Sequence, residues 1–404
     1  MVRARARARG SPCLGRDQRG LRPMTVRFIH TADWQLGMTR HFLSLEAQAR
    51  FTQARIDGIR TIGNVAREEG ASFVVVAGDV FESNQLEPRT VRRTIEALRD
   101  IPVPVYLLPG NHDPLDASTI YRSPTFVEHK PEHVIVLDDS SKRQVAPGVE
   151  VLGAPWLSKR VVKDLVQAAI AELRPADSAA RVLVAHGVPR DPLAGENPAA
   201  IDLDFVEAAI AERRIAYLAL GDRHSTTPLG SSGAIWYSGT PEPTAHDESD
   251  AGNVLVVEID DGHVSKVEPR RVGTWTFREE AFELDSEAGV DTLANWLDAC
   301  PAKDRCAVRL KLYGTISLST DAQLQELLDR NRDVFGALEI VGSAAALVVR
   351  PDDDDFADLQ LTGFVDRAVD ELRGAATRTG PDQQKARDAL GLLIRLLQSK
   401  GGQA

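Results

Sequence analysis

Short runs of apolar residues alternate with amphipathic stretches from Val26 to about Ile259. A run of four to eight apolar residues indicates a buried strand, and apolar residues three and four apart indicate a helix. Strands are predicted at residues 26–29, 73–77, 104–108, 133–137, 181–185, 215–220, 234–238 and 253–259. Helical spacing occurs at residues 45–69, 88–99, 160–173 and 204–213. The alternation predicts an α/β fold built as a β-sandwich flanked by helices.

The pattern changes after about residue 272. Apolar runs within residues 305–314 and 337–342 lie on either side of a helical pattern near residues 322–334, which predicts a smaller α+β unit. An acidic run at residues 352–355 is typical of a solvated linker, and two short helices are expected after it. We therefore expect four segments, at residues 1–23, 24–271, 272–350 and 351–404.

The last predicted helix carries an apolar stripe that is wider than a one-sided surface helix needs, because Leu392 and Leu396 extend it. The stripe itself, at spacings of three and four, consists of Ala386, Ala389, Leu390, Leu393, Ile394 and Leu397. Such a helix either docks on a partner protein or packs on its own chain, and both interpretations stay open at this point.

Residues 1–23 differ from the rest of the chain. They contain seven Arg and one Asp, and four of these Arg occupy every second position at the start. Such a segment is expected to be disordered, and no apolar stretch follows that would make a signal peptide. Because Met24 directly precedes the first predicted strand, a wrongly assigned upstream start codon is our leading explanation. An arm that binds nucleic acid is the alternative.

The composition restricts the class of protein. The 404 residues carry a formal net charge of −11, which argues against a broad basic surface for polyanions but leaves room for phosphate binding through metal ions. No stretch approaches eighteen apolar residues, so we expect no membrane span and a cytoplasmic protein. Cys13, Cys300 and Cys306 are too few for a disulfide framework and lack zinc-ligand spacing.

Polar residues of one chemical kind follow five of the predicted strands. They are Asp33 and Gln35; Gly78 and Asp79; Gly110, Asn111, His112 and Asp113; His186 and Gly187; and Gly221, Asp222 and His224. In an α/β sheet ligands bind beyond the carboxyl ends of the strands, so these five groups are expected to converge. Carboxylates gathered in one crevice require cations. Oxygen ligands with a minority of imidazole suit Mn²⁺ or Mg²⁺, with Fe²⁺ or Zn²⁺ as alternatives.

The order of these motifs, DWQ, GD, GNHD, H and GDRH, resembles the calcineurin-like metallophosphoesterase superfamily, whose pattern is DxH, GD, GNH(D/E), H and GHxH. They look most like its SbcD-type branch, the nuclease subunit of a double-strand-break repair complex that works with an SMC-like ATPase. The motif SGTPEP at residues 238–243 is similar to that branch as well. The smaller unit fits the capping domain of the branch less specifically. The terminal helices fit its ATPase-docking segment in placement and amphipathicity.

The resemblance implies two divalent metal ions, most simply Mn²⁺, with Asp79 bridging them. It assigns Asp33, Gln35, Asp79 and His224 to one ion, and Asp79, Asn111, His186 and Asp222 to the other. Two such ions activate water and stabilise the leaving oxygen of a phosphodiester. His112 is left as a non-ligand imidazole that protonates the leaving 3′ oxygen, with Asp113 or a backbone group orienting its ring.

Three residues depart from the family pattern. Gln35 and Asp222 stand where the family has His, which exchanges two imidazoles for oxygen donors and favours Mn²⁺ or Mg²⁺ over zinc. Glu82 stands where the nuclease branch commonly has His, and an anionic side chain there puts efficient nuclease activity in question. For Gln35 the alternative to ligation is a hydrogen bond to a neighbouring loop, with water in its coordination position.

Three further residues are candidates for substrate binding. Trp34 lies between two predicted ligands and is expected either to stack on an unpaired base or to pack beneath the site. His41 follows the first motif and either contacts a substrate phosphate or begins a helix. Arg223 lies between two predicted ligands and either contacts substrate or forms a surface salt bridge.

The resemblance therefore implies a two-metal DNA exonuclease or endonuclease subunit that acts in DNA repair with an SMC-like ATPase, bound through the C-terminal helices. It also implies a homodimer. One rival is a phosphoesterase acting on small nucleotide phosphodiesters. A second is a catalytically weak scaffold in which DWQ, Glu82 and GDRH mark a decayed site.

Overall fold

The structure is a computed structural model. It describes residues 25–343, 346–349, 364–378, 380, 382–386, 388–390 and 392–393, apart from residues 177, 178, 192, 194 and 196. The predicted tail at residues 1–23 and the acidic linker at residues 352–355 lie outside the described residues.

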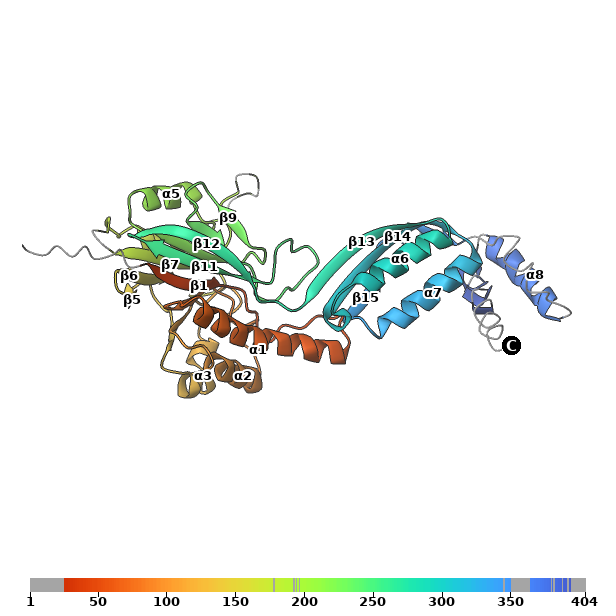
Figure 1. The fold of residues 1–404 in the computed structure, drawn as a ribbon, viewed down its shortest axis with the longest axis horizontal. Helices are drawn as coiled ribbons and strands as arrows, with labels where there is room; N and C mark the ends of the chain where they lie inside the picture. Colours follow the sequence, from red (N-terminus) through yellow and green to blue (C-terminus); the bar gives the residue numbers. More distant parts are fainter. Residues whose placement is uncertain are drawn as a thin grey trace, which may run out of the picture.

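Two six-stranded sheets form the larger part of the molecule (Figure 1). In spatial order the first consists of β12 (His263–Arg271), β11 (Asn253–Asp260), β1 (Val26–Thr31), β2 (Val74–Val76), β3 (Val105–Leu107) and β4 (Val134–Val136). The second consists of β5 (Arg143–Ala146), β6 (Val149–Ala154), β7 (Ala180–His186), β8 (Tyr217–Gly221), β10 (Ile235–Tyr237) and β9 (Thr227–Leu229). The predicted α/β sandwich is confirmed.

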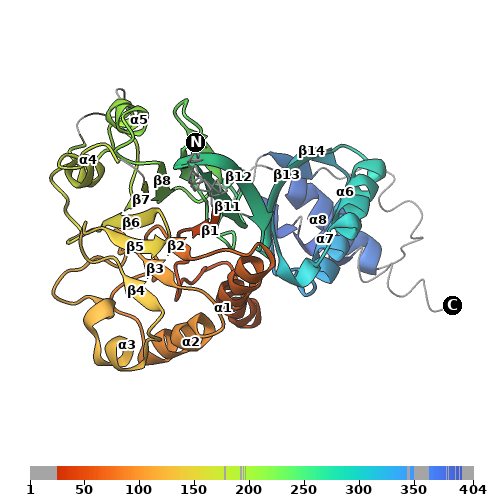
Figure 2. The ribbon, with the colours of Figure 1, turned by 60° about the vertical axis from the view of Figure 1, so that its left-hand side comes forward.

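The central strands are buried on both faces, which explains their continuous apolar runs. In β1, Phe28 packs between the two sheets, while the next residue, Ile29, packs on the outer face. Helices α1 (Leu45–Glu68), α2 (Pro88–Leu98) and α3 (Pro124–His129) pack on the first sheet, and a short 3₁₀ helix η1 (Ile120–Arg122) directly precedes α3. Helices α4 (Leu165–Ile170) and α5 (Leu203–Ala211) cover the second sheet (Figure 2). Helices thus cover the outer face of each sheet.

A third sheet lies beside the sandwich and consists of β13 (Thr276–Leu284), β14 (Cys306–Ile316), β15 (Ala337–Ile340) and β16 (Leu347–Val349). It is accompanied by α6 (Glu287–Ala299), η2 (Lys303–Arg305) and α7 (Leu318–Arg332). All of its strand pairs are parallel, so this smaller unit has an α/β organisation, where the sequence pattern indicated α+β. Parallel neighbours require crossover connections, and α6 and α7 provide them.

The smaller unit packs against the beginning of α1. Phe51 of α1 contacts Trp275 edge to face at a ring-centroid distance of 5.1 Å, and both side chains are fully buried. Ser44 caps α1 by accepting a hydrogen bond from the backbone N–H of Ala47 at 3.1 Å, which fixes where the helix begins. The loop that joins β1 to α1 is therefore held between the sandwich and the third sheet.

The C-terminal segment contains α8 (Phe364–Thr377) and a further helical turn around Ala386. Ala386 and Leu390 of the predicted stripe are buried against Leu318 and Val369, so part of the stripe packs on its own chain. Leu392 is 51% exposed. Ile394, Leu396 and Leu397 lie outside the described residues, and docking on a partner remains a prediction.

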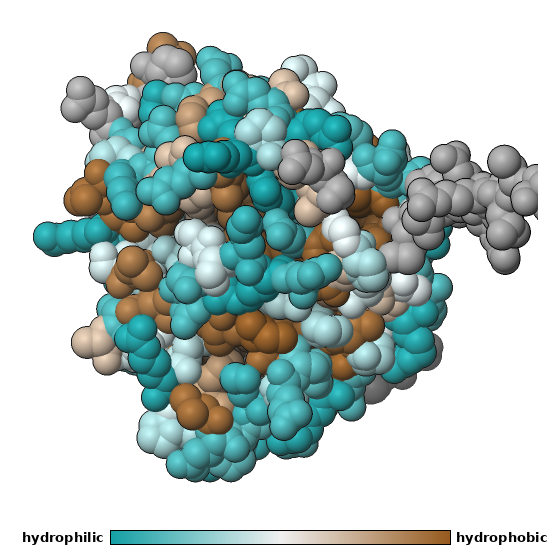
Figure 3. Space-filling view, turned by 90° about the vertical axis from the view of Figure 1, so that its left-hand side faces the viewer, coloured by the Kyte–Doolittle hydropathy of each residue, from teal (hydrophilic) through white to brown (hydrophobic). Residues whose placement is uncertain are grey.

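Figure 3 views the end of the sandwich that lies away from the smaller unit, and shows hydrophobic patches interspersed with hydrophilic side chains. Within the described residues, no helix combines the length and the apolar character needed to cross a bilayer.

Candidate metal centre

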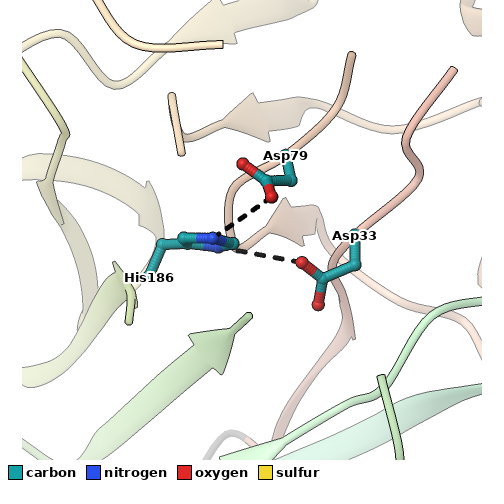
Figure 4. A group of neighbouring side chains, drawn as sticks. All are labelled: Asp33, Asp79 and His186. Carbon is teal, nitrogen blue, oxygen red and sulfur yellow. Dashed lines mark ion pairs between the residues drawn. The ribbon is translucent and has the colours of Figure 1, made fainter. Parts of the chain in front are cut away.

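The five groups of polar residues meet where β1, β2, β3, β7 and β8 end. Asp33, Asp79 and His186 lie at the centre, and each places a ligand atom within 4.8 Å of the others (Figure 4). Asp33 and Asp79 follow strands of the first sheet, whereas His186 ends a strand of the second. The donor set is therefore built across the sandwich.

The His186 imidazole has a defined orientation. Its Nδ1 lies 2.9 Å from the backbone carbonyl oxygen of Ala77, and because that oxygen can only accept, Nδ1 carries the proton. The lone pair of neutral Nε2 then faces Asp79 Oδ2 at 3.4 Å and Asp222 Oδ1 at 3.5 Å. A lone pair directed at two carboxylates requires a positive charge between them, either a proton or a metal ion. Burial alone lowers the pKa of His186, but these carboxylates raise it well above its usual value.

Asn111 completes this side of the site, because its side-chain amide lies 2.7 Å from His186 Nε2. With the amide nitrogen turned inward, Asn111 donates to Nε2 and to both oxygens of Asp79, at 3.1 and 3.2 Å. With the amide oxygen turned inward, it presents an oxygen ligand beside the same carboxylate. The side chain thus suits the site both with and without a cation.

Asp33 is fully buried, and its carboxylate accepts the backbone N–H of Asp222 at 3.0 and 3.1 Å. Burial raises the pKa of Asp33 to about 7, the imidazoles of His186 and His224 oppose this rise, and Asp79 adds to it. Burial also acts to raise the pKa of Asp79, but His186 and His112 hold it below its ordinary value. Two buried carboxyls so close together form an environment that favours divalent cations.

On the other side of the site, Gln35 Nε2 lies 3.2 Å from His224 Nε2. The Oε1 atom of Gln35 is buried and has no hydrogen-bond partner. His224 is held through Nδ1 by Glu248 Oε1 at 2.7 Å and by Thr244 Oγ1 at 2.9 Å, which fixes its ring and leaves Nε2 facing Gln35. Burial lowers the pKa of His224, but the hydrogen bond to Glu248 raises it to above its usual value.

His112 lies beside the centre. Its backbone N–H donates to Asp79 Oδ1 at 2.9 Å, and its ring Nδ1 lies 3.0 Å from the backbone carbonyl of Glu82. The sequence analysis left open whether Asp113 or a backbone group orients the His112 ring, and the structure shows a contact with the backbone group. Nδ1 donates to this carbonyl, so Nε2, which is 4.0 Å from Asp79 Oδ2, is free to exchange a proton with a substrate. The Glu82 carboxylate is 3.8 Å from Nδ1, and burial raises its pKa.

Asp113 is fully buried beneath this loop. Its carboxylate accepts hydrogen bonds from the backbone N–H of Gly110 at 2.7 Å, from the N–H of Phe81 at 3.0 Å and from the Tyr121 hydroxyl at 2.6 Å. These bonds tie the loop after β3 to the loop after β2, so Asp113 positions His112 through the backbone.

Four of the predicted ligands have a left-handed backbone, with φ of 53° at Asp33, 42° at Gln35, 51° at Asp79 and 103° at Asp222. Such conformations cost about 1–3 kcal/mol each in non-glycine residues and concentrate at functional sites. Glycines make the approach of the strands possible. A Cβ atom at Gly78 would lie 2.2 Å from His186 Nδ1, and a Cβ at Gly110 would lie 2.2 Å from Asp79 Oδ1.

The three predicted substrate-binding residues differ in placement. The structure contradicts base stacking by Trp34, because its side chain is 2% exposed and its Nε1 donates to Thr31 Oγ1 at 3.0 Å. Trp34 packs beneath the site, which was the alternative interpretation. His41 and Arg223 are exposed, so both are accessible to a substrate.

Sequence reasoning missed three residues that support the ligands. Glu248 holds His224, and Thr240 Oγ1 donates to the backbone carbonyl of Asp33 at 2.9 Å. Arg55, from α1, is buried and donates to the Trp34 carbonyl at 2.6 Å. Thr240 lies within the motif SGTPEP, whereas Glu248 and Arg55 have no local signal in the sequence.

These observations fit divalent metal ions. The centre offers carboxylate, amide and imidazole donors, which are the ligands of Mn²⁺ and related ions. Gln35 Oε1 is a buried oxygen without a hydrogen-bond partner, and the Nε2 lone pair of buried His186 faces two carboxylates, so both are available to a cation. Carboxyls with the pKa of Asp33 release their protons readily to a competing cation near neutral pH.

Comparisons with known proteins agree with this chemistry. A family model described as calcineurin-like phosphoesterase matches residues 26–241. The chain is similar to the SbcD component of the nuclease SbcCD from Rhodobacter capsulatus, with 30% identity over 268 residues that cover 55% of this chain and 64% of the relative. It is also similar to the DNA double-strand break repair protein Mre11 of Archaeoglobus fulgidus, with 35% identity over 91 residues, 22% of this chain and 19% of the relative. The chain thus spans less than two thirds of the length of either relative.

Among solved structures, a dimetal phosphatase from Danio rerio aligns with a TM-score of 0.38 and 12% identity, covering 61% of this chain and 99% of the phosphatase.

Proposed function

Because the chain belongs to the calcineurin-like phosphoesterase family, we propose that it is a two-metal phosphodiesterase that cuts DNA. The observation that carries the proposal is the buried donor set of Asp33, Asp79 and His186, which two sheets bring together. The resemblance to an SbcCD nuclease component over more than half of the chain supports DNA as the substrate. The whole chain's activity, its metal and its partners belong to this proposal.

One ion would be held by Asp33, Gln35, Asp79 and His224, and the second by Asp79, Asn111, His186 and Asp222. When bound, the two ions supply Lewis-acid activation of the phosphodiester and of a water molecule. The predominance of oxygen donors favours Mn²⁺.

His112 would act as the general acid. Its Nδ1 is engaged by the Glu82 carbonyl, so Nε2 is the atom that protonates the leaving 3′ oxygen. Asp113 keeps the loop in place and is a positioning residue. Exposed Arg223, close to the site, would contact the substrate strand, and exposed His41 would do so from the loop after the first motif.

The partners we propose are DNA and an SMC-like ATPase that binds the C-terminal helices, with a homodimer as the assembly and the cytoplasm as the location. Similarity to the SbcCD nuclease supports this assignment. The exposed side chain of Leu392 is available for such a contact, whereas Leu390 packs on its own chain.

The test is hydrolysis of linear DNA and of bis(4-nitrophenyl) phosphate in Mn²⁺ by the wild type, Asp79→Ala, His112→Ala and the control His129→Ala. His129 is an exposed histidine on α3, outside the site. We expect Asp79→Ala to remove both activities and His112→Ala to reduce DNA cleavage by roughly 100-fold or more. Rapid hydrolysis of the small ester with intact DNA would reject the nuclease proposal.

A second candidate function, a catalytically weak scaffold, is favoured by one observation. The contact of Gln35 Nε2 with His224 Nε2 at 3.2 Å pairs two proposed ligands with each other. A scaffold would show no Mn²⁺ binding in calorimetry and no loss of any activity in Asp79→Ala.

A further inference from the structure

Arg40 is a half-buried cation in the loop that leads from the first motif into α1. Its Nε atom is buried and has no hydrogen-bond partner, and Arg40 makes no ion pair within the part of the chain that the structure describes. A buried N–H without a partner loses hydration without compensation. The loop itself is fixed, because the backbone N–H of Arg40 donates to Gln48 Oε1 of α1 at 2.8 Å. A held, unpaired cation is suited to an anionic ligand.

Arg40 lines a groove of about 450 Å³, a size typical of ligand pockets, between the sandwich and the third sheet. One wall consists of Thr39, Arg40, His41 and Phe42, a second of residues 244–247, and a third of Glu279 and Arg309. In Figure 1 the third sheet begins close to the start of α1, which places the two parts on either side of this loop. The groove is thus shared by both parts of the molecule.

A second unpartnered group lines the same groove. The Nε2 atom of His246 is buried without a hydrogen-bond partner, and its ring packs edge to face on Phe277 at 5.1 Å. Burial and the charge of Arg309 lower the pKa of His246, so at neutral pH it is an uncharged hydrogen-bonding group. The backbone of Ala307 acts to raise this pKa by accepting a hydrogen bond from the ring, so the free Nε2 atom of neutral His246 is an acceptor. Arg40 therefore supplies the donors for the oxygens of an anionic ligand.

Two of the other charged groups of the groove have ion-pair partners. Glu279 forms an ion pair with Lys311, and Arg309 lies 3.5 Å from Glu339. Asp247 is exposed, so water and salt screen its charge. Of the two arginines that line the groove, Arg40 is the one that makes no ion pair within the described residues, which matches a single phosphate better than a long polyanionic track.

The groove adjoins the candidate metal centre. Thr244, which lines the groove, contacts His224 Nδ1 at 2.9 Å. Arg40 lies near enough to Glu82 for its charge to act on the pKa of that carboxyl, and Glu82 contacts His112. A strand whose phosphodiester lies at the metal centre would therefore run beside residues that also line the groove.

We propose that Arg40 binds a phosphate adjacent to the one being cut, and that the groove selects polynucleotide strands over single phosphodiesters. This inference depends on the proposed function and specifies its substrate class. A guanidinium binds phosphate oxygens through charge-assisted hydrogen bonds, which an ester with only one phosphate cannot use at this second position.

The experiment compares the wild type with Arg40→Ala, Arg40→Lys and the control Arg92→Ala, which removes an exposed arginine of α2. For each protein, kcat/KM is measured in Mn²⁺ on a single-stranded oligothymidylate and on bis(4-nitrophenyl) phosphate. Binding of the same fluorescent oligonucleotide to chelated protein is measured separately by anisotropy. Thermal melting establishes that each variant is folded.

For Arg40→Ala, we expect the ratio of the two kcat/KM values to fall roughly tenfold or more, and the oligonucleotide Kd to rise by a similar factor. Arg40→Lys should restore part of the kcat/KM ratio and part of the oligonucleotide affinity. Arg92→Ala should match the wild type in both quantities. Equal ratios and equal Kd values for the wild type and Arg40→Ala would overturn this inference while leaving DNA cleavage intact. If the wild type hydrolyses the ester but neither cuts nor binds the oligonucleotide, both the inference and the nuclease proposal fail.

Discussion

Replacing Asp33 with Asn should change how the stability of the metal-free protein depends on pH. The Asp33 carboxyl is fully buried, and its pKa is raised to about 7 from an ordinary value near 4. A group whose pKa is raised by folding contributes its full stabilisation below the unfolded pKa, and that stabilisation is lost as the pH rises through the folded pKa. Folding of the chelated wild type is therefore opposed increasingly between about pH 4 and pH 7.

The size of the effect follows from the shift. Three pKa units correspond to about 4 kcal/mol over the whole window, and about 2 kcal/mol of this falls between about pH 5.5 and pH 8. In Asp33→Asn the amide does not titrate, so this component disappears. The amide oxygen still accepts a hydrogen bond where Asp33 accepts the N–H of Asp222, which keeps the comparison isosteric.

The assay is urea unfolding of EDTA-treated protein at the two pH values, for the wild type, Asp33→Asn and the exposed control Asp285→Asn. The wild type should lose about 2 kcal/mol more unfolding free energy than Asp33→Asn between the lower and the higher pH. Mn²⁺ at about 100 times its Kd should then restore about 2.7 kcal/mol per site in the wild type at about pH 8, and less in the variant. Parallel pH profiles for the wild type and Asp33→Asn would refute the assignment of a desolvated carboxyl at this position.

Three other substitutions test separate parts of the site. Gly78→Ala should abolish Mn²⁺ binding in calorimetry, because the added Cβ would lie 2.2 Å from His186 Nδ1. Gly70→Ala is its control, since Gly70 also has a positive φ but has no neighbouring atom within 4 Å. If both variants lost Mn²⁺ affinity equally, backbone strain alone would explain the loss. Glu248→Ala should weaken Mn²⁺ binding roughly 10- to 100-fold by releasing the ring of His224, and an unchanged affinity would show that Thr244 alone holds the ring. Tyr121→Phe should reduce kcat on DNA while Mn²⁺ affinity stays the same, because the lost hydrogen bond to Asp113 loosens the loop that carries His112. A loss of Mn²⁺ binding instead would show that Asp113 supports the metal ligands rather than His112.

The strands that the sequence predicted are mainly those buried on both faces, such as β2 and β8, since burial on both sides produces a continuous apolar run. The sequence pattern did not predict β12, which is an edge strand with a largely exposed surface and a proline. It also did not predict β6, in which Glu150 interrupts the run of apolar residues. Glu150 is paired with Arg181 on the neighbouring strand at 3.1 Å. Such a partner comes from tertiary structure, which no local pattern records.

The contrast between local sequence patterns and tertiary contacts also applies to the site residues. The proposed ligands could be found because each directly follows a strand, where chain order alone predicts convergence. Glu248, Arg55 and Arg40 could not, because they lie on loops or a helix whose positions depend on packing between distant segments. Trp34 illustrates the reverse error. Its place between two ligands suggested a stacking platform, but the backbone turns at Asp33 and Gln35, and the Trp34 side chain lies in the hydrophobic core.

Two of the three departures from the family motifs, Asp222 and Gln35, lie on opposite sides of the centre. Asp222 faces His186, whereas Gln35 faces His224, at 3.5 and 3.2 Å. If the proposed ligands hold two ions, one ion gains a charged oxygen ligand in place of an imidazole, and the other receives a neutral amide. The ion beside Asp222 would then be bound more strongly than the ion beside Gln35. Because Asp79 is a proposed ligand of both ions, the more tightly held ion would draw on this carboxylate and weaken its hold on the second. In that case the two changes would not cancel, and the two metal positions would be unequal.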